Sequence, residues 1–168
     1  SRPNRTEMFR LIDSPLGPLR LQASPRGLSR VEFTAASILQ KEMGGVEEGD
    51  VGKRSADVLD AAQAQLTEYF AGRRRSFELP LDPPATTDFR AAVHAQLAEI
   101  DYGETVTYRD VAKLLGRAGA TRAVGSACGA NRLLIVRPCH RVLRSDGGLG
   151  GYAGGLEAKR FLLTLEEN

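Results

Sequence analysis

The chain has 168 residues, of which 42% are hydrophobic and 26% are charged, and its formal net charge is +2. This composition is typical of a folded globular protein and excludes a long disordered chain, a collagen-like repeat and a coiled coil. No apolar run reaches the roughly 18 to 20 residues of a membrane-spanning helix, and residues 1–7 lack the apolar core of a secretion signal. We therefore expect a cytoplasmic protein, without a membrane partner, that forms one large domain or two small ones.

The positive charge is concentrated in one segment. Residues 1–85 carry twelve basic and twelve acidic side chains, whereas residues 109–144 carry eight basic side chains against one acidic side chain, a local net charge of +7. An excess of this size is typical of a surface that binds nucleic acid, because each neutralised phosphate releases counterions. A solvated basic face explains the charge alone equally well.

The first third of the chain predicts a β-meander. Residues 8–12 and 19–23 are short apolar-rich segments, and a third strand with apolar residues at 28, 31 and 33 follows the turn at 26–27. Residues 35–53 are polar and show no clear periodicity, and apolar residues then fall at helical spacing from Val58 until the helix ends at Gly72. The proline-rich residues 79–84 predict a stiff linker. We place the domain boundary here, which gives an N-terminal domain of residues 1–82 and a C-terminal domain of residues 83–168.

The C-terminal half predicts a helix-turn-helix. One helix starts near Thr87 and ends before Gly103. Residues 107–110 resemble a capping box that opens a second helix ending at Gly116, and a third helix covers residues 120–129. Two short helices joined by a glycine turn indicate a helix-turn-helix, although such hairpins also occur in proteins that never bind DNA.

The third of these helices is built almost entirely from small residues, and Arg122 is its prominent long polar side chain. A helix that reads base edges in the major groove normally exposes Asn, Gln or several Arg side chains, so we expect no sequence-specific reading. Small residues let a backbone approach a minor groove about 6 Å wide, with Arg122 free to enter the base stack. Close packing against the neighbouring helix is the alternative, and for Ala123 and Ala127 taken alone we favour it.

Cysteine chemistry is predicted to centre on Cys139. The two cysteines and two histidines are too few for a closed structural zinc site, so we expect no metal, and a disulfide is not expected in a reducing cytosol. A buried-strand pattern at residues 133–136 leads into Arg137, and the adjacent His and Arg side chains predict a stabilised thiolate at Cys139. On an extended backbone Cys139 and His140 point to opposite sides, so a proton relay needs a turn or a bridging water. Cys128 is interpreted as a small buried hydrophobe.

The run Pro-Cys-His-Arg-Val-Leu at residues 138–143 resembles the active-site signature of the O6-alkylguanine-DNA alkyltransferases, also called methylated-DNA-protein-cysteine methyltransferases. The resemblance extends to residues 102–108, 121–125, Asn131 and 151–155. It covers residues 87–168 strongly and the N-terminal half only loosely.

The resemblance implies an α+β protein. Its N-terminal part would be a ribonuclease-H-like α/β domain with a small antiparallel sheet, and its C-terminal part a mostly helical domain with a helix-turn-helix. The implied function is DNA repair on double-stranded DNA by a monomer, in which the alkyl group of O6-alkylguanine is transferred to the protein's own cysteine in a single turnover after base flipping. No cofactor is implied, and O4-alkylthymine is an open second substrate.

The resemblance also implies a role for each matching residue. Cys139 is the nucleophile, His140 is its base through a water molecule, and Glu166 orients His140. Asn131 braces the active-site turn, and Tyr108 protonates guanine N3 as the base leaves.

Other implied roles concern DNA and the guanine pocket. Arg122 fills the gap left by the flipped nucleotide. The remaining implied DNA contacts are Ala123, Tyr108 and Ser145, and the implied pocket residues are Val142, Tyr152, Ala153 and Gly154.

Three features depart from the family pattern. Arg137 replaces an aliphatic residue, so either the strand end is exposed or Arg137 contacts phosphate. We hypothesise the phosphate contact, so that Arg137→Ala would weaken DNA binding and flatten its salt dependence. Ala153 replaces the hydroxyl residue that some members carry in the pocket loop, which leaves the substrate range open. The N-terminal Cys and His residues that hold zinc in some relatives are missing.

Three other functions compete with this interpretation. A non-catalytic alkyltransferase-like lesion binder would carry another residue in place of Cys139. A small DNA-binding regulator would need a recognition helix with more polar side chains. An unrelated Cys-His hydrolase would leave the +7 segment and Arg122 unexplained.

Overall fold

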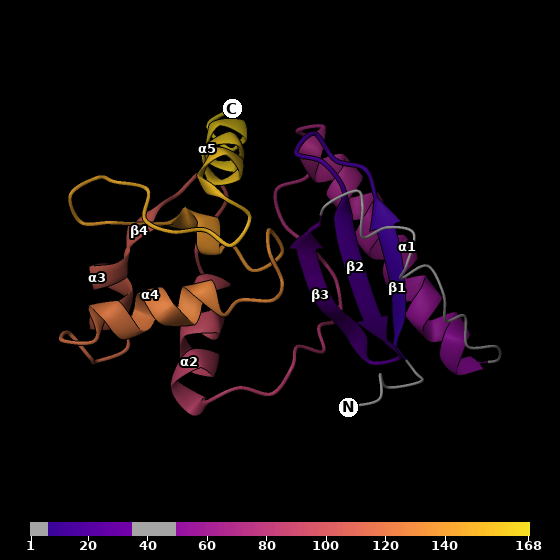
Figure 1. Cartoon of the computed structure of the whole chain (residues 1–168), viewed down its shortest axis with the longest axis horizontal. Helices are drawn as coiled ribbons and strands as arrows, with labels where there is room; N and C mark the ends of the chain where they lie inside the picture. Colours follow the sequence, from indigo (N-terminus) through magenta and orange to yellow (C-terminus); the bar gives the residue numbers. More distant parts are fainter. Residues whose placement is uncertain (1–6, 35–49) are drawn as a thin grey trace. The chain divides into compact units, whose positions relative to one another are not determined.

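The computed structural model describes residues 7–34 and 50–168 and divides the chain into two compact units, Ser1–Pro84 and Ala85–Asn168 (Figure 1). Within the described ranges, no helix is long and apolar enough to cross a membrane. The same ranges contain no group of three or more His, Cys, Asp or Glu side chains that could hold a metal ion.

The first unit begins with the predicted meander. Strands β1 (Met8–Ile12), β2 (Leu19–Ser24) and β3 (Gly27–Phe33) form an antiparallel sheet in the order β1-β2-β3 (Figure 1). Along β2, Leu19 and Leu21 are fully buried, whereas Arg20 between them is partly exposed. This alternation follows the two-residue period of a strand and directs one face of the sheet into a core.

Helix α1 (Asp50–Phe70) packs across that sheet and contacts all three strands (Figure 1). Its buried face carries Val58, Leu59, Ala62, Leu66 and Tyr69. The helix begins earlier than the sequence predicts, because residues 50–57 are mostly polar or small and lack the apolar period that marks a helix. The remaining part of the segment expected to be irregular, residues 35–49, lies outside the described residues.

The proline-rich segment predicted as a linker pairs in part with the end of the sheet. The Leu28 amide donates to the Pro80 carbonyl over 2.8 Å, and the Asp82 amide donates to the Leu28 carbonyl over 2.8 Å. A Cβ atom at Gly27 would lie 2.5 Å from the Pro80 oxygen, so this close approach requires glycine. The segment up to Asp82 is therefore held against β3.

The second unit is mostly helical. Its elements in chain order are α2 (Asp88–Leu97), β4 (Val106–Thr107), α3 (Tyr108–Leu114), α4 (Thr121–Gly129), the 3-10 turn η2 (Cys139–Arg141), β5 (Val142–Leu143) and α5 (Leu156–Leu165). The two short strands β4 and β5 pair in parallel, and α4 packs against both α2 and α3. The order α3-turn-α4 confirms the predicted helix pair.

Side-chain caps set the starts of α2 and α3. Thr87 Oγ1 accepts a hydrogen bond from the Arg90 amide over 3.2 Å at the start of α2. At the start of α3, Thr107 Oγ1 accepts from the Asp110 amide and the Asp110 carboxylate accepts from the Thr107 amide. This reciprocal pair confirms the predicted capping box. It also fixes Tyr108 as the first residue of α3.

Candidate active site and DNA-binding face

The segment leading to Cys139 is a turn. The prediction of a buried strand at residues 133–136 is wrong, because Leu133 makes only an isolated β-bridge and residues 134–136 form turns in which Ile135 has a positive φ of 71°. Leu133, Leu134 and Ile135 are nevertheless buried, so the apolar run reflects burial and not strand geometry.

Asn131 braces this turn from within. Its Oδ1 accepts from the Leu133 amide over 3.0 Å, and its Nδ2 donates to the Arg137 carbonyl over 2.9 Å. Asn131 is itself buried, so these bonds form away from solvent. The bonds tie both ends of the turn together and place Cys139 at the start of η2.

Cys139 is buried, with 4% of its surface exposed, and Asn131 Nδ2 donates to its Sγ over 3.3 Å. Burial is the largest influence on the pKa of Cys139 and raises it. The bond from Asn131 and the charges of Lys159 and Arg137 lower the pKa by less. The expectation of a thiolate stabilised by its sequence neighbours is therefore wrong for the resting site, since desolvation outweighs them. A neutral buried thiol needs a base.

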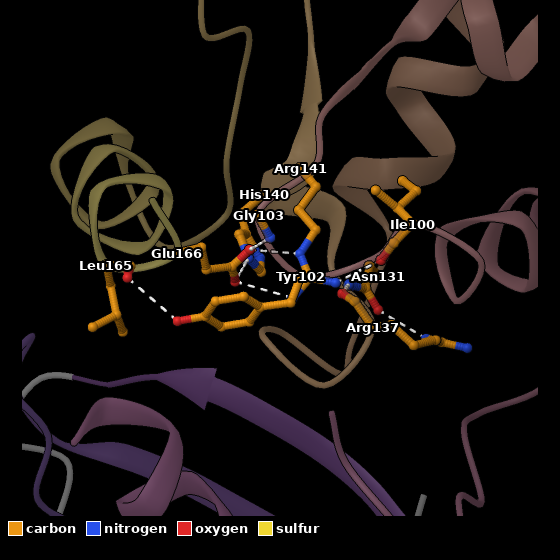
Figure 2. Close-up of polar contacts among 9 residues, drawn as sticks. All are labelled: Ile100, Tyr102, Gly103, Asn131, Arg137, His140, Arg141, Leu165 and Glu166. Atoms are coloured by element: carbon orange, nitrogen blue, oxygen red, sulfur yellow. Dashed lines mark hydrogen bonds and ion pairs between the residues drawn. The ribbon is translucent and has the colours of Figure 1, made fainter. Parts of the chain in front are cut away.

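His140 is placed to be that base. Its ring is fully buried, and Nε2 lies 2.7 Å from Glu166 Oε2, at the end of α5 (Figure 2). Because a carboxylate only accepts hydrogen bonds, Nε2 carries the proton and Nδ1 keeps its lone pair. Among the described residues, Nδ1 has no hydrogen-bond partner. Burial also lowers the pKa of His140, so the ring is neutral and able to accept a proton.

No direct hydrogen bond joins Cys139 and His140, although both lie on η2. The 3-10 turn removes the extended backbone that would have directed the two side chains apart. The resulting arrangement fits proton transfer through a bridging water.

Arg141 is a residue whose role the sequence did not reveal. Its Nε donates to Glu166 Oε1 over 2.7 Å and its Nη2 donates to Glu166 Oε2 over 3.1 Å, which makes a bidentate pair (Figure 2). Its Nη1 donates to the Ile100 carbonyl over 2.6 Å, and the Gly103 amide approaches Glu166 Oε1 at 3.4 Å. Glu166 thus accepts from several directions, and its orientation sets that of the His140 ring.

Lys159 was also missed, because an interior lysine on a helix has no sequence signal that separates it from a surface lysine. The residue is fully buried on α5. Its Nζ donates to the Val142 carbonyl over 2.7 Å and to the Gly151 carbonyl over 3.2 Å. Lys159 thereby ties β5 to the loop before α5. Its charge also favours the thiolate of Cys139, since it lowers the pKa of that thiol.

Tyr108 opens α3 and lies against Gly150. A Cβ atom at Gly150 would stand 2.6 Å from the Tyr108 hydroxyl, so the phenol occupies the space that a side chain would fill. Burial raises the pKa of Tyr108 to about 12, with a smaller contribution from the two cysteines. The phenol is therefore protonated at neutral pH and available as a donor.

The predicted pocket residues fall into two groups. Val142 is buried in β5, and the Tyr152 ring lies edge-on to the His140 ring with centroids 6.4 Å apart, so both belong to the centre. Of the other two pocket residues, Ala153 is exposed and Gly154 is half-exposed, and Ser145, which is an implied DNA contact, is exposed as well. Among the described residues, no hydrogen bond links these last three to Cys139.

Helix α4 presents an exposed stripe of small residues around one arginine. Arg122, Ala123 and Ser126 are exposed, whereas Val124 and Ala127 are buried. The expectation of close packing is therefore right for Ala127 and wrong for Ala123. The Ala127 carbonyl also accepts a hydrogen bond from His94 Nε2 over 2.8 Å. Cys128 is buried as predicted, and both cysteines are free.

Comparisons with known proteins match both parts of the chain. Residues 88–168 match the family described as 6-O-methylguanine DNA methyltransferase, DNA binding domain, and residues 8–83 match the ribonuclease-like domain of the same proteins. These matches, with the three-stranded antiparallel sheet, confirm the predicted ribonuclease-like N-terminal domain and helical DNA-binding C-terminal domain.

Individual relatives agree over nearly the whole chain. The methylated-DNA-protein-cysteine methyltransferase of Methanosarcina barkeri is 42% identical over 95% of this chain and 97% of its own length. The protein of the same name from Mycobacterium tuberculosis is 38% identical over 95% of this chain and 92% of its own. A crystal structure of Mycobacterium tuberculosis OGT in complex with DNA is similar with a TM-score of 0.79 and 37% identity, covering 95% of this chain and 92% of that one. The chain belongs to the O6-methylguanine DNA methyltransferase family, in both its domains.

Proposed function

We propose that the chain repairs O6-alkylguanine in double-stranded DNA by transferring the alkyl group to Cys139 in a single turnover, as a monomer. The observation that carries this proposal is the arrangement of a buried thiol, an amide donor at its sulfur and a neutral His140 held by Glu166. The three together supply a nucleophile, a stabiliser of its charge and a base.

The chemistry is a displacement at the alkyl carbon. His140 Nδ1 takes the thiol proton through a bridging water, and the sulfur of Cys139 attacks the alkyl carbon. A carbon–sulfur bond forms as the carbon–O6 bond breaks, and the electron pair of that bond stays on guanine. Guanine is a poor leaving group, so a proton from the Tyr108 phenol at N3 lowers the barrier. These transfers leave His140 protonated and Tyr108 deprotonated, and a proton passed from His140 to Tyr108 through solvent restores both groups. Overall, the alkyl group ends on sulfur, and guanine gains one proton in place of the one that the thiol lost.

The alkyl carbon lies inside the duplex and is out of reach of a buried thiol until the nucleotide is flipped out. The exposed stripe of α4 supports this step, because its small residues let the helix approach the minor groove. Arg122 stands on this stripe and is long enough to occupy the gap in the base stack. Phosphate contacts from the +7 segment would supply the affinity.

A titration tests single turnover. Protein is mixed with an excess of duplex carrying one O6-methylguanine, and the restored guanine is counted by nucleoside mass spectrometry. The product should reach a plateau at one equivalent per protein, because a thioether offers no easy hydrolytic route back to the thiol. Cys139→Ser should form no product, and Cys128→Ser should behave as the wild type. Product beyond one equivalent would contradict the proposal, and binding without product would favour a lesion binder.

A further inference from the structure

Arg137 lies at the end of the turn that Asn131 braces, two residues before Cys139, and its inner nitrogen points toward the active site. Its Nε donates to Asn131 Oδ1 over 3.0 Å (Figure 2). The other end of the same amide, Nδ2, donates to Cys139 Sγ over 3.3 Å and to the Arg137 carbonyl over 2.9 Å. Arg137 therefore contacts both ends of the amide that reaches the nucleophile.

The chemistry of arginine fixes which way this amide points. A guanidinium only donates hydrogen bonds, so the atom facing Nε must be the amide oxygen. The Leu133 amide donates to the same Oδ1 over 3.0 Å and therefore favours the same orientation of the Asn131 amide. A flipped amide would direct its NH₂ group at two donors and its oxygen at the sulfur of Cys139, which would oppose negative charge there.

We propose that Arg137 is a positioning residue for the alkyl transfer, which locks the Asn131 amide so that Nδ2 donates to the sulfur of Cys139 as its charge develops. This inference rests on the proposed function, because it concerns the same thiol. A preoriented donor strengthens as its acceptor becomes an anion and needs no reorganisation during the reaction. The charge of the half-buried guanidinium also favours the Cys139 thiolate, since it lowers the pKa of Cys139.

This role differs from the phosphate contact hypothesised from the sequence. A phosphate contact would use the outer nitrogens of Arg137, which make no hydrogen bond to any of the residues that the structure describes. Positioning uses Nε and acts without DNA. The two roles therefore differ in whether the thiol changes when no DNA is present.

Two substitutions separate the hydrogen bond from the charge. Glutamine matches arginine atom for atom up to Nε, so Arg137→Gln keeps an N–H donor at that place and removes the charge. Arg137→Met has the same length without the donor. Arg160→Met is the matched control, because Arg160 is exposed on α5 and lies outside the site.

Three quantities are measured for each variant in a Cys128→Ser background, so that Cys139 is the remaining thiol. The first is the pH profile of Cys139 alkylation by iodoacetamide without DNA. The second is the rate of alkyl transfer at saturating duplex with one O6-methylguanine. The third is the affinity for that duplex and its salt dependence. Thermal melting checks that each variant folds, and Arg137→Leu replaces Arg137→Met if the latter does not.

Arg137→Met should move the midpoint of the alkylation profile to higher pH and slow transfer roughly three- to tenfold, as expected for one lost hydrogen bond. The DNA affinity of Arg137→Met and the salt dependence of that affinity should stay unchanged. Arg137→Gln should retain most of the wild-type transfer rate. Arg160→Met should match the wild type in the alkylation profile. An unchanged alkylation profile with weaker, less salt-dependent DNA binding would overturn the proposal in favour of a phosphate contact. Equal losses in the Gln and Met variants would also overturn it, because charge would then account for the effect.

The alkylation profile also separates the two proposals. If the wild-type protein transferred no alkyl group, the proposed function would fail. The reactivity of Cys139 without DNA would still show whether Arg137 positions Asn131.

Discussion

His140 Nε2 and Glu166 Oε2 are 2.7 Å apart, and Arg141 binds both oxygens of the same carboxylate. The guanidinium balances the carboxylate charge, so Glu166 orients the imidazole without drawing a second proton onto it. Burial then keeps the pKa of His140 low. In the resting site, His140 is therefore a neutral base and Cys139 is a neutral thiol.

Removing the carboxylate charge should weaken both the fold and the reaction. Glu166→Gln leaves the buried Arg141 without its anionic partner, so we expect the free energy of unfolding to fall by about 3 kcal/mol. We also expect alkyl transfer to slow at least about tenfold, because the His140 ring loses its orientation. Urea denaturation and single-turnover kinetics measure the two effects. Glu167→Gln, at the exposed neighbouring position, is the control, and equal behaviour of the two variants would contradict the assigned role.

Gly150 should be required for the placement of Tyr108. In Gly150→Ala the new Cβ would meet the Tyr108 hydroxyl at 2.6 Å, and we expect the displaced phenol to slow transfer at least about tenfold. Gly147→Ala is a matched control, because Gly147 also has a positive φ, of 86°, but an added Cβ there meets nothing within 4 Å. Both variants carry backbone strain of about 1 to 2 kcal/mol, because an L-residue is forced to a positive φ. If both slowed transfer equally, strain and not the Tyr108 contact would be the cause.

Much of the fold follows from the sequence, because its elements are periodic and capped. The strands up to Phe33 are short apolar-rich segments separated by turn residues, and the capping box at Thr107 and Asp110 marks a helix start. The turn at residues 134–136 could not be predicted, since an apolar run indicates burial and leaves the backbone geometry open.

The site was predictable where a motif carried it. Cys139, His140, Glu166 and Asn131 lie together as the resemblance implies. Arg141, Lys159 and the Nε of Arg137 were not predicted to point inward. Charged side chains are normally exposed, and the sequence does not reveal the groups that each of these three binds in the folded structure.

Acid should destabilise the folded protein. Burial lowers the pKa of both His94 and His140 below the ordinary value of 6.5. Below about pH 6.5 these two histidines therefore bind protons in the unfolded chain but stay neutral in the folded chain. The free energy of unfolding should therefore fall as the pH drops below about 6.5, by at most about 1.4 kcal/mol per pH unit for each histidine. Urea denaturation at several pH values measures the slope. His94→Gln should flatten it, and a wild-type stability that is constant between pH 7.5 and 5.5 would contradict the assignment.

Arg122 should matter only when the base must leave a duplex. Arg122→Ala should slow transfer from duplex O6-methylguanine roughly ten- to a hundredfold, because the emptied base stack loses its support. Reaction with the free alkylated base should stay unchanged, since Arg122 is exposed on α4. Arg160→Ala controls for the loss of one charge. Equal loss on both substrates would show that Arg122 acts on the thiol site and not on the DNA.

The central claim is that Cys139 receives the alkyl group. Intact-protein mass spectrometry after incubation with a duplex carrying one O6-methylguanine tests it most directly, followed by peptide mapping and with Cys139→Ala as the control. We predict a gain of about 14 Da, the replacement of a thiol hydrogen by methyl, confined to the Cys139 peptide and missing in the control. An unchanged mass, or the same gain on Cys128 or in the control, would contradict the account.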